Sequence, residues 1–357
     1  MRLLGGYIGR SVLFASLAVL LVIVTLDLVF SLLDELGGLR GDYGLFEAII
    51  YMLMRLPERF YLFLPIAALV GVLVGLGGLA STSELTVMRA AGVSIPRLIW
   101  QAAKPIAVLL LVAMLASEFV LLQWVQAAES YRWEKRTGQQ RASVSSAQDL
   151  WLKEEHQFYR IQVARDDGQL LGVTIYQLDA NWQLSERITA ARADWQEQEG
   201  HWVLRDVQRL RLDPEQLQQE RLSSLVWPVP IAPEFVALQA FDPRDLPPTR
   251  LWHYAHYLEA RGQPSGFYWL ALWQKLLLPI TVFAVVLLGA SFTFGPLRSV
   301  PAGTRVFHGI LIGLSVKFAQ DLLGPAALLW GFPPILAVLI PAGFCAAWGG
   351  WQIYRTG

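Results

Sequence analysis

The sequence predicts a polytopic α-helical membrane protein with six transmembrane helices, arranged 3 + 3 around an inserted all-β, jelly-roll-like domain. Of its 357 residues, 54% are hydrophobic and only 16% are charged, whereas a soluble domain carries about a quarter charged residues. Six apolar stretches approach or exceed the roughly 20 residues that span a bilayer. The long segment between the third and fourth stretches instead shows the alternating pattern of β-strands.

The first apolar stretch could be either a signal peptide or a membrane span. It is too long for a signal peptide, lacks an obvious small-residue cleavage site and is interrupted by Asp27, so we expect an uncleaved span. The six predicted spans are Ser11–Leu33, Phe60–Leu79, Pro105–Val125, Phe267–Phe292, Val306–Trp330 and Pro334–Ile353.

The arginines and lysines of the short loops predict the orientation of these spans. An even number of spans places both termini on one side, and most basic loop residues fall there, although Arg132, Lys135 and Arg136 lie on the other side. The positive-inside rule therefore places both termini in the cytoplasm and the inserted domain outside. The basic residues on the side of the termini are Arg2, Arg10, Arg89, Arg97, Lys104, Arg298, Arg305 and Arg355.

The segment 126–248 is predicted to form the β domain, between helices in 1–125 and 249–357. It carries 14 Lys and Arg against 19 Asp and Glu, and Leu171, Val173 and Ile175 alternate with more polar residues. Turn signals such as Glu199-Gly200 separate these runs. Several short strands at this spacing suggest a sandwich, a jelly roll or an open barrel.

A helix at Thr249–Arg261 is predicted to lie on the membrane surface, because Trp252, Tyr254 and Tyr257 give it interfacial character. His253 and His256 are three residues apart, which is compatible with one metal ion, but no acidic third ligand stands at a convincing distance. We therefore favour an exposed helix and expect no metal.

Several kinds of chemistry have no motif in this chain. We find no G-x-x-x-x-G-K-[ST] loop for ATP phosphates, no G-x-S-x-G elbow and no H-E-x-x-H pair. The formal net charge is zero, without the basic excess of a nucleic-acid-binding protein. Gly75, Gly77 and Gly78 lie inside an apolar span, where small residues let helices pack closely.

The loop at 81–100, between the second and third spans, contains a predicted short amphipathic helix. Ser83 is expected to cap its N-terminus and Gly92 to end it. Such a helix, exposing Glu84, Leu85, Met88 and Arg89, would suit docking to a cytoplasmic partner. The alternative is an interfacial turn without a partner.

Four short stretches and the order of the spans give the sequence a family resemblance. The stretches Ser83–Leu85 through Gly92, Phe294–Pro301, Gly324-Pro325 and Pro333-Pro334, together with the 3 + 3 layout, resemble the YjgP/YjgQ family of lipopolysaccharide export permeases. The likeness covers essentially the whole chain. The Phe294–Pro301 string is its most specific part, and it favours one of the family's two paired subunit types.

The resemblance implies half of an ABC exporter in the inner membrane of a Gram-negative bacterium. Its partners would be an LptF-like permease, an LptB-like ATPase dimer, an LptC-like subunit and a periplasmic LptA-like bridge. The complex would extract lipopolysaccharide, with ATP and Mg²⁺ bound in the ATPase and no cofactor in this chain. The helix carrying Glu84 would be the coupling helix, and spans one and five would face the partner permease.

Charged residues within the spans are candidates for substrate contact, because each is costly in a bilayer unless it faces protein or water. Lys317 and Asp321 are four apart, so they either pair with each other or contact substrate. The same alternatives hold for Asp27, Glu118 and Lys275. For the two acids we expect pairing with a lysine or with the partner subunit. For anionic headgroups we predict Arg40, Arg55, Arg59 and Lys317, although Asp34, Glu35 and Asp42 stand beside Arg40.

Three alternatives to lipopolysaccharide export follow from the same sequence. A lipoprotein-releasing or efflux permease is disfavoured, because such proteins have four spans and an outer domain near the first. A membrane scaffold without transport activity would differ by lacking a bound ATPase. An intramembrane enzyme is disfavoured because no nucleophile and base stand together in the sequence.

Overall fold

The structure, a computed structural model, describes residues 2–38, 42–137, 150–154, 156–164, 169–179, 181–197, 199–212, 217–228, 236, 242–294 and 300–356. The chain divides into two compact units. One comprises residues 1–39, 44–125 and 247–357 and is helical, whereas the other comprises residues 40–43 and 126–246 and contains the sheet.

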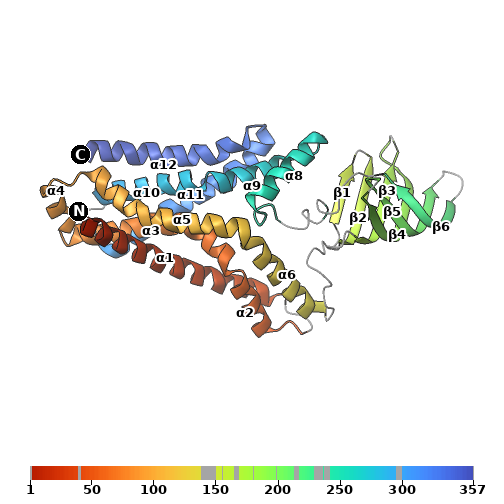
Figure 1. Ribbon diagram of the computed structural model, residues 1–357, viewed down its shortest axis with the longest axis horizontal. Helices are drawn as coiled ribbons and strands as arrows, with labels where there is room; N and C mark the ends of the chain where they lie inside the picture. Colours follow the sequence, from red (N-terminus) through yellow and green to blue (C-terminus); the bar gives the residue numbers. More distant parts are fainter. Residues whose placement is uncertain are drawn as a thin grey trace. The chain divides into compact units, whose positions relative to one another are not determined.

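The helical unit is a bundle of long apolar helices (Figure 1). Among the residues that the structure describes, five helices are long and apolar enough to cross a membrane, and there are six if the bent pair α9 and α10 forms one span. This confirms the predicted fold class of a polytopic helical membrane protein with an inserted sheet. The helices are α1 (Arg2–Leu36), α2 (Leu45–Met54), α3 (Leu56–Ser81), α4 (Glu84–Ala90), α5 (Ile95–Phe119), α6 (Leu121–Thr137), α8 (Pro248–Ala260), α9 (Gly266–Leu276), α10 (Leu278–Phe294), α11 (Ala302–Trp330) and α12 (Pro334–Thr356).

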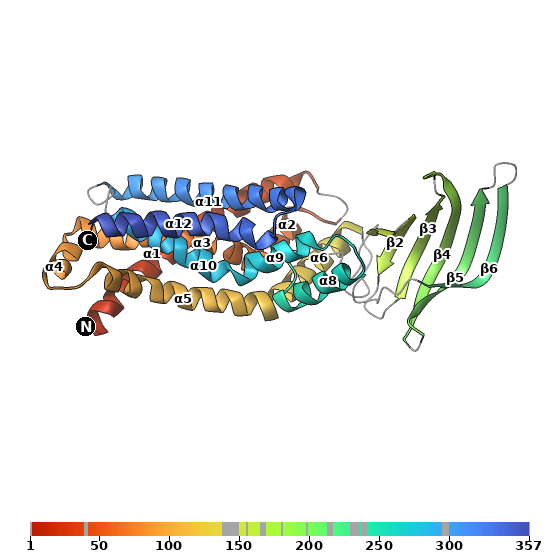
Figure 2. The same cartoon turned by 90° about the horizontal axis from the view of Figure 1, so that it is seen from above.

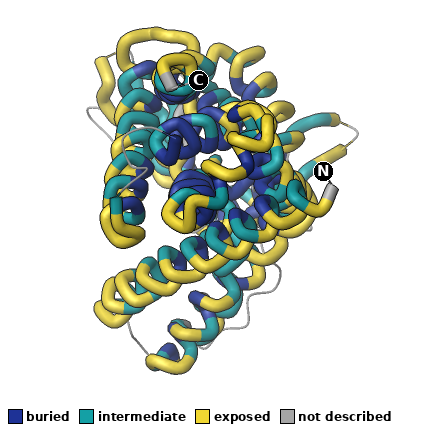
Figure 3. The backbone as a smooth tube through the Cα atoms, turned by 90° about the vertical axis from the view of Figure 1, so that its left-hand side faces the viewer, coloured by how far each residue is buried: buried dark blue, intermediate teal, exposed yellow. Residues whose placement is uncertain are grey.

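Helix α3 is the centre of the bundle. It is apolar on all sides, as expected of a helix surrounded by other helices, and it packs against α1, α5, α10 and α11. Figure 3 shows the buried segments inside a ring of exposed ones. A Cβ at Gly75 would stand only 2.8 Å from Cα of Val12 in α1, so the predicted close packing is confirmed there. At Gly78 nothing lies within 4 Å.

Prolines account for two differences from the predicted spans. Pro105 was expected to begin the third span, but it lies inside α5, which starts at Ile95 and ends at Phe119. Membrane helices tolerate such prolines because neighbouring groups satisfy the freed carbonyl. At Pro279, in contrast, the helix is interrupted. The fourth span is broken at Leu277, with a bend of 52° between α9 and α10. Pro279 cannot donate to the carbonyl of Lys275, which weakens the helix at that point.

The second unit contains a six-stranded antiparallel sheet (Figure 2). The strands β1 (Leu150–Glu154), β2 (Gln157–Ala164), β3 (Gln169–Leu178), β4 (Leu184–Gln196), β5 (His201–Leu212) and β6 (Leu217–Trp227) pair in sequence order. The all-β character is therefore confirmed, while the strand order is that of a meander rather than the Greek keys of a jelly roll. Residues 126–137, placed in the β domain by sequence, continue helix α6.

One face of the sheet carries the core of this unit. Tyr159, Ile161, Val173, Trp202 and Leu204 are each at most 1% exposed and pack together. Val173 and Ile175 of the predicted alternating run face this core, as a period of two implies. Leu171 of the same run is only half-buried, and its neighbour Leu170 is buried instead.

The helix predicted at Thr249–Arg261 is present as α8, and its two faces differ in burial. Leu251, Tyr254 and Leu258 are buried, whereas Trp252 and His256 on the other face are exposed. The ring nitrogen Nδ1 of His256 lies 2.9 Å from the carbonyl oxygen of Trp252. Within the described ranges, no group of three or more His, Cys, Asp or Glu residues could hold a metal ion.

Candidate functional site

Helix α4 lies at the end of the bundle where both termini of the chain are found (Figure 1). The connection from α3 differs from the one we predicted. Ser83 adopts a left-handed conformation, with φ 63°, and its side chain makes no capping hydrogen bond. Its carbonyl oxygen instead accepts from the backbone N–H of Thr86, at 3.0 Å, and of Val87, at 3.1 Å. The predicted Ser83 side-chain cap is therefore wrong, because a capping side chain requires an extended backbone at that residue, and Ser83 is left-handed.

The end of α4 is the one predicted. Gly92 has φ +86°, the left-handed region that glycine adopts without strain. Its N–H donates to the carbonyl of Arg89 at 2.9 Å, and the N–H of Val93 donates to that of Met88 at 3.1 Å. This pair of bonds is the Schellman motif, so Gly92 fixes where the chain leaves α4.

The exposed face of α4 is only partly the predicted one. Leu85 and Met88 are 3% and 9% exposed and belong to the main core of the bundle. Their expected exposure is therefore wrong: spaced three apart, they lie on one face of the helix and anchor it to the bundle. Val87 is 67% exposed, and Arg89 is exposed as well.

Glu84 is held at the first turn of α4 by two hydrogen bonds. Its carboxylate accepts from the hydroxyl of Thr82 at 2.9 Å and is hydrogen-bonded to the hydroxyl of Tyr7 in α1. A carboxylate in the first turn also interacts favourably with the helix dipole. Glu84 thus has a defined position where α1, α3 and α4 meet, and it remains partly accessible.

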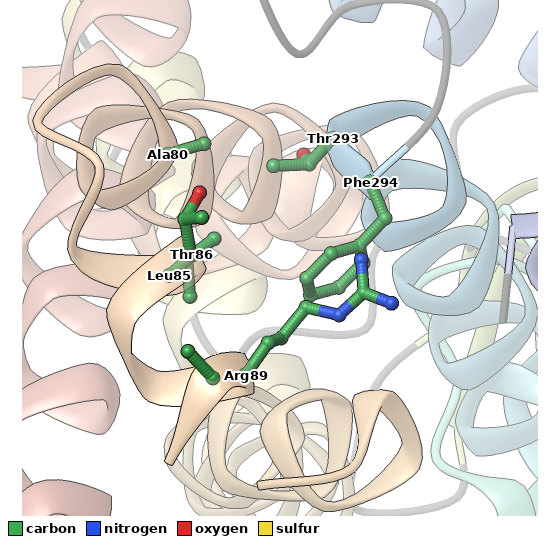
Figure 4. A pocket seen from close by; sticks show the side chains of 7 residues that line it. Ala80, Leu85, Thr86, Arg89, Thr293 and Phe294 are labelled. Carbon is green, nitrogen blue, oxygen red and sulfur yellow. The ribbon is translucent and has the colours of Figure 1, made fainter. Parts of the chain in front are cut away.

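A pocket of about 320 Å³ opens beside α4. Figure 4 shows that side chains from α4 and from the end of α10 reach into it. Its lining combines a cation with small and apolar groups, so it can accept an apolar or acidic side chain of a partner. The lining residues are Ala80, Leu85, Thr86, Arg89, Ala90, Thr293 and Phe294.

The predicted headgroup arginines are already partnered within the chain, as far as the structure describes them. The guanidinium of Arg55 lies 2.6 Å from the carboxylate of Glu58, and that of Arg59 lies 3.0 Å from the carboxylate of Asp27 in α1. Arg40, the third of them, lies outside the described residues, as does Arg298. The Arg59–Asp27 pair joins α1 to α3, so Asp27 is paired, but with an arginine of this chain instead of the expected lysine or partner subunit.

The remaining charges of the spans also have partners. Lys317 Nζ lies 2.9 Å from the carboxylate of Asp321 on α11. Lys275 is 5% exposed, and its Nζ donates to the hydroxyl of Ser117 at 3.2 Å and lies 5.6 Å from the ring centre of Tyr61. The hydroxyl of Thr249 donates to the carboxylate of Glu118. The alternative of internal pairing is thus realised for Lys317 and Asp321.

One residue near the site had no distinct role in the sequence reading. Arg305 counted there only as a basic loop residue, yet it is 2% exposed in the first turn of α11. The signal that marks it is its spacing, because Arg305, Gly309 and Gly313 recur every four residues and lie on the face of α11 that meets α3.

Comparison with known proteins shows which family has this arrangement of helices and sheet. Residues 6–355 match the sequence model of a family described as lipopolysaccharide export system permease LptF/LptG. The chain is 33% identical to the lipopolysaccharide export system permease protein LptG of Escherichia coli strain K12 over 354 residues, 99% of this chain and 98% of that protein. It is 31% identical to LptG of Haemophilus influenzae over 340 residues, 95% and 94% of the two chains. The match includes both helical segments and the sheet between them, and the chain therefore belongs to the LptF/LptG family of lipopolysaccharide export system permeases.

Proposed function

We propose that this chain is a permease subunit of an ABC exporter that extracts lipopolysaccharide from the inner membrane for delivery to the outer membrane. The observation that carries the proposal is the near-complete match to LptG relatives, which includes the bundle, α4 and the inserted sheet. The chain has no phosphate-binding loop, so ATP and Mg²⁺ would be bound by a separate ATPase dimer of the LptB type.

The ATPase would dock on α4. The exposed Val87 and Arg89, the fixed carboxylate of Glu84 and the adjoining pocket form a surface with both charge signs around an apolar centre. Leu85 and Met88 tie that surface to the core. A movement imposed on α4 would therefore be carried into the bundle instead of being absorbed by a loose loop.

Lipid would enter along the two helices with the most exposed apolar faces. Only 22% of the apolar stretch of α1 and 11% of that of α11 is buried within the chain. An LptF-like permease would face these helices. The acyl chains would pass between each of these helices and the facing helix of the partner permease when the two separate. The exposed apolar residues of α11 include Phe307, Leu311, Leu314, Phe318, Leu322 and Leu329.

The orientation follows from the basic loop residues. Under the positive-inside rule both termini and α4 face the cytoplasm, where the ATPase is. The sheet then lies in the periplasm, on the side where an LptC-like subunit and an LptA-like bridge would receive the lipid. Four basic residues are proposed to contact the anionic headgroup: Arg40, Arg55, Arg59 and Lys317. The last three already pair with carboxylates of this chain, so each would interact with the headgroup and with its carboxylate at the same time.

The test is ATP-dependent release of lipopolysaccharide from proteoliposomes that contain this chain with its copurifying permease and ATPase. We expect release to an acceptor protein to require ATP, and Glu84→Lys to uncouple ATP turnover from release or to loosen ATPase binding. Glu259→Lys is the matched control, because Glu259 is an exposed glutamate on α8, far along the chain from α4, and it should behave as the parent.

Two alternatives give different results in the same assay. A lipoprotein-releasing permease would export an acylated protein in place of lipopolysaccharide, and a scaffold would purify without an ATPase. Unchanged assembly and transport in Glu84→Lys would contradict the proposed docking surface.

A further inference from the structure

We propose that Arg305 is a positioning residue that ties the first turn of α11 to the last turns of α3, so that a movement of α4 reaches α11. This inference rests on the proposed function, because it assigns α11 to the lipid path and α4 to the ATPase. Arg305 touches neither lipid nor nucleotide; it would act through the two helices it joins.

The burial of Arg305 is the first observation. Its side chain is 2% exposed, and its Nε donates to the carbonyl oxygen of Val300 at 2.9 Å. A buried guanidinium is unfavourable unless the geometry around it is good. It also stands in the first turn of its own helix, where the dipole disfavours a cation. An apolar residue would fill this buried position equally well, so packing alone does not explain an arginine there.

The contact with α3 is the second observation. A Cβ on Gly77 would collide with Nη1 of Arg305 and stand 2.9 Å from both its Cδ and its Cζ. Gly77 lies in the last turns of α3, where the helix dipole favours a cation. The absence of a side chain at Gly77 is what lets the guanidinium lie against α3.

The rest of the interface between α3 and α11 is close and apolar. A Cβ on Gly309 would stand 2.7 Å from Cδ1 of Leu73, and one on Gly313 would stand 3.2 Å from Cγ2 of Ile66. Small residues at this spacing let helices approach without fixing how far one slides along the other. Arg305, at the end of this stripe, adds a guanidinium that is hydrogen-bonded to the carbonyl of Val300 and packs closely against Gly77 of α3.

The last turn of α3 is in turn bound to the start of α4. The hydroxyl of Ser81 donates to the carbonyl of Gly78 at 2.7 Å, and the N–H of Thr82 donates to the same oxygen at 3.2 Å. Thr82 also bonds Glu84. A displacement of α4 therefore moves the turn against which Arg305 lies, and Arg305 carries it to α11.

Two adjacent glycines offer a matched test. Gly77→Ala places a methyl group against Arg305, whereas Gly78→Ala meets nothing within 4 Å, so the two variants add the same group one residue apart. Arg305→Gln removes the charge, and Arg305→Lys restores it without the fork of donors. Each variant would be assembled into the complete complex, and lipopolysaccharide released per ATP hydrolysed would be measured in proteoliposomes.

We expect Arg305→Gln and Gly77→Ala to keep ATPase binding and turnover while release per ATP falls about fivefold or more. The release per ATP of Arg305→Lys should lie between that of these two variants and that of the parent, and the release per ATP of Gly78→Ala should equal the parent's. An unchanged ratio in Gly77→Ala and Arg305→Gln, or a loss of assembly in both, would overturn the inference. If Arg305→Gln alone fails to assemble, the release per ATP of Gly77→Ala decides between the inference and its rejection. A parent complex that releases no lipopolysaccharide would count against the proposed function instead.

Discussion

Helices α3 and α11 are both long and apolar, yet they differ in how much of their surface is buried within the chain. Of the most apolar stretch of each helix, 72% is buried in α3 and 11% in α11. Most of the surface of α3 is covered by this chain. Helix α11 offers the chain one face and leaves Phe318, Leu322 and Leu329 exposed. Apolar composition thus marks a membrane helix, and burial separates a helix that holds the bundle together from one that meets lipid or another protein.

The largest expected effect comes from truncating one leucine on each helix. Leu76 of α3 is fully buried and Leu322 of α11 is 72% exposed. Leu76→Ala should lower the free energy of unfolding by about 2–5 kcal/mol, because the packed bundle cannot close the cavity, and Leu322→Ala by about 0.5 kcal/mol or less. Thermal unfolding of the detergent-solubilised chain measures both. Equal losses would show that the two helices do not differ as described.

Charge pairs extend the comparison. Asp27–Arg59 joins α1 to α3, whereas Lys317–Asp321 lies on α11 alone. Double-mutant cycles should give a coupling energy of about 1 kcal/mol for the first pair, which is partly exposed and partly screened, and about 0.5 kcal/mol or less for the second. The readout is again thermal unfolding. A larger coupling within α11 would mean that its charges do support the bundle.

Substrate binding should be affected less than stability. Arg55 and Arg59 already face Glu58 and Asp27, so each would share its charge with a headgroup phosphate. We expect the Arg40, Arg55 and Arg59 triple alanine variant to bind lipopolysaccharide more weakly by about 1 kcal/mol, and Lys317→Ala by less. Lipopolysaccharide bound to the purified complex at low salt is the measure. Parental binding by the triple variant would place the phosphates elsewhere, for example on the partner permease.

The smallest effect concerns the sheet and the pKa of Glu186 in β4. Burial acts to raise the pKa of Glu186, but the hydrogen bonds and charges of Arg209 and Arg211 outweigh it and hold that pKa below its usual 4.5. This carboxylate therefore stabilises the sheet above pH 4.5, and its contribution is lost as the pH falls through the lowered pKa.

Hydrogen exchange of peptides from β4 and β5, corrected for the intrinsic pH dependence, tests this effect. Glu186→Gln should remove part of the acid-induced loss of protection seen in the parent. The control Glu197→Gln, at an exposed position, should leave it intact. Identical profiles for parent and Glu186→Gln would contradict the role given to the pair.

The features that were predicted correctly from sequence are mostly local. Gly92 ends α4 and Lys317 pairs with Asp321 because each outcome depends on residues within one or two turns. The alternation within β3 likewise identified Val173 and Ile175 as inward-facing. Length and composition located the apolar spans, although the third begins earlier, at Ile95, and the fourth is broken at Leu277.

The features that sequence missed depend on a second element. Leu85 and Met88 were expected to face a partner, since one sequence does not show which side of α4 meets the bundle. Arg59 pairs with Asp27 across two helices, a contact that no spacing indicates. Pro105 lies inside α5 without breaking it, whereas the fourth span is broken just before Pro279, and the proline alone does not indicate which outcome follows.

The most direct test of the account is photo-crosslinking from the two compared helices. The crosslinking amino acid p-benzoylphenylalanine would replace Leu322 on α11 or, as the control, Leu76 on α3, in the complete ATPase-bearing complex. The account predicts that position 322 forms adducts with lipopolysaccharide or with the partner permease, and that position 76 forms them only within this chain. Adducts from position 322 with bulk phospholipid alone would contradict the claim that the exposed face of α11 borders the lipid path.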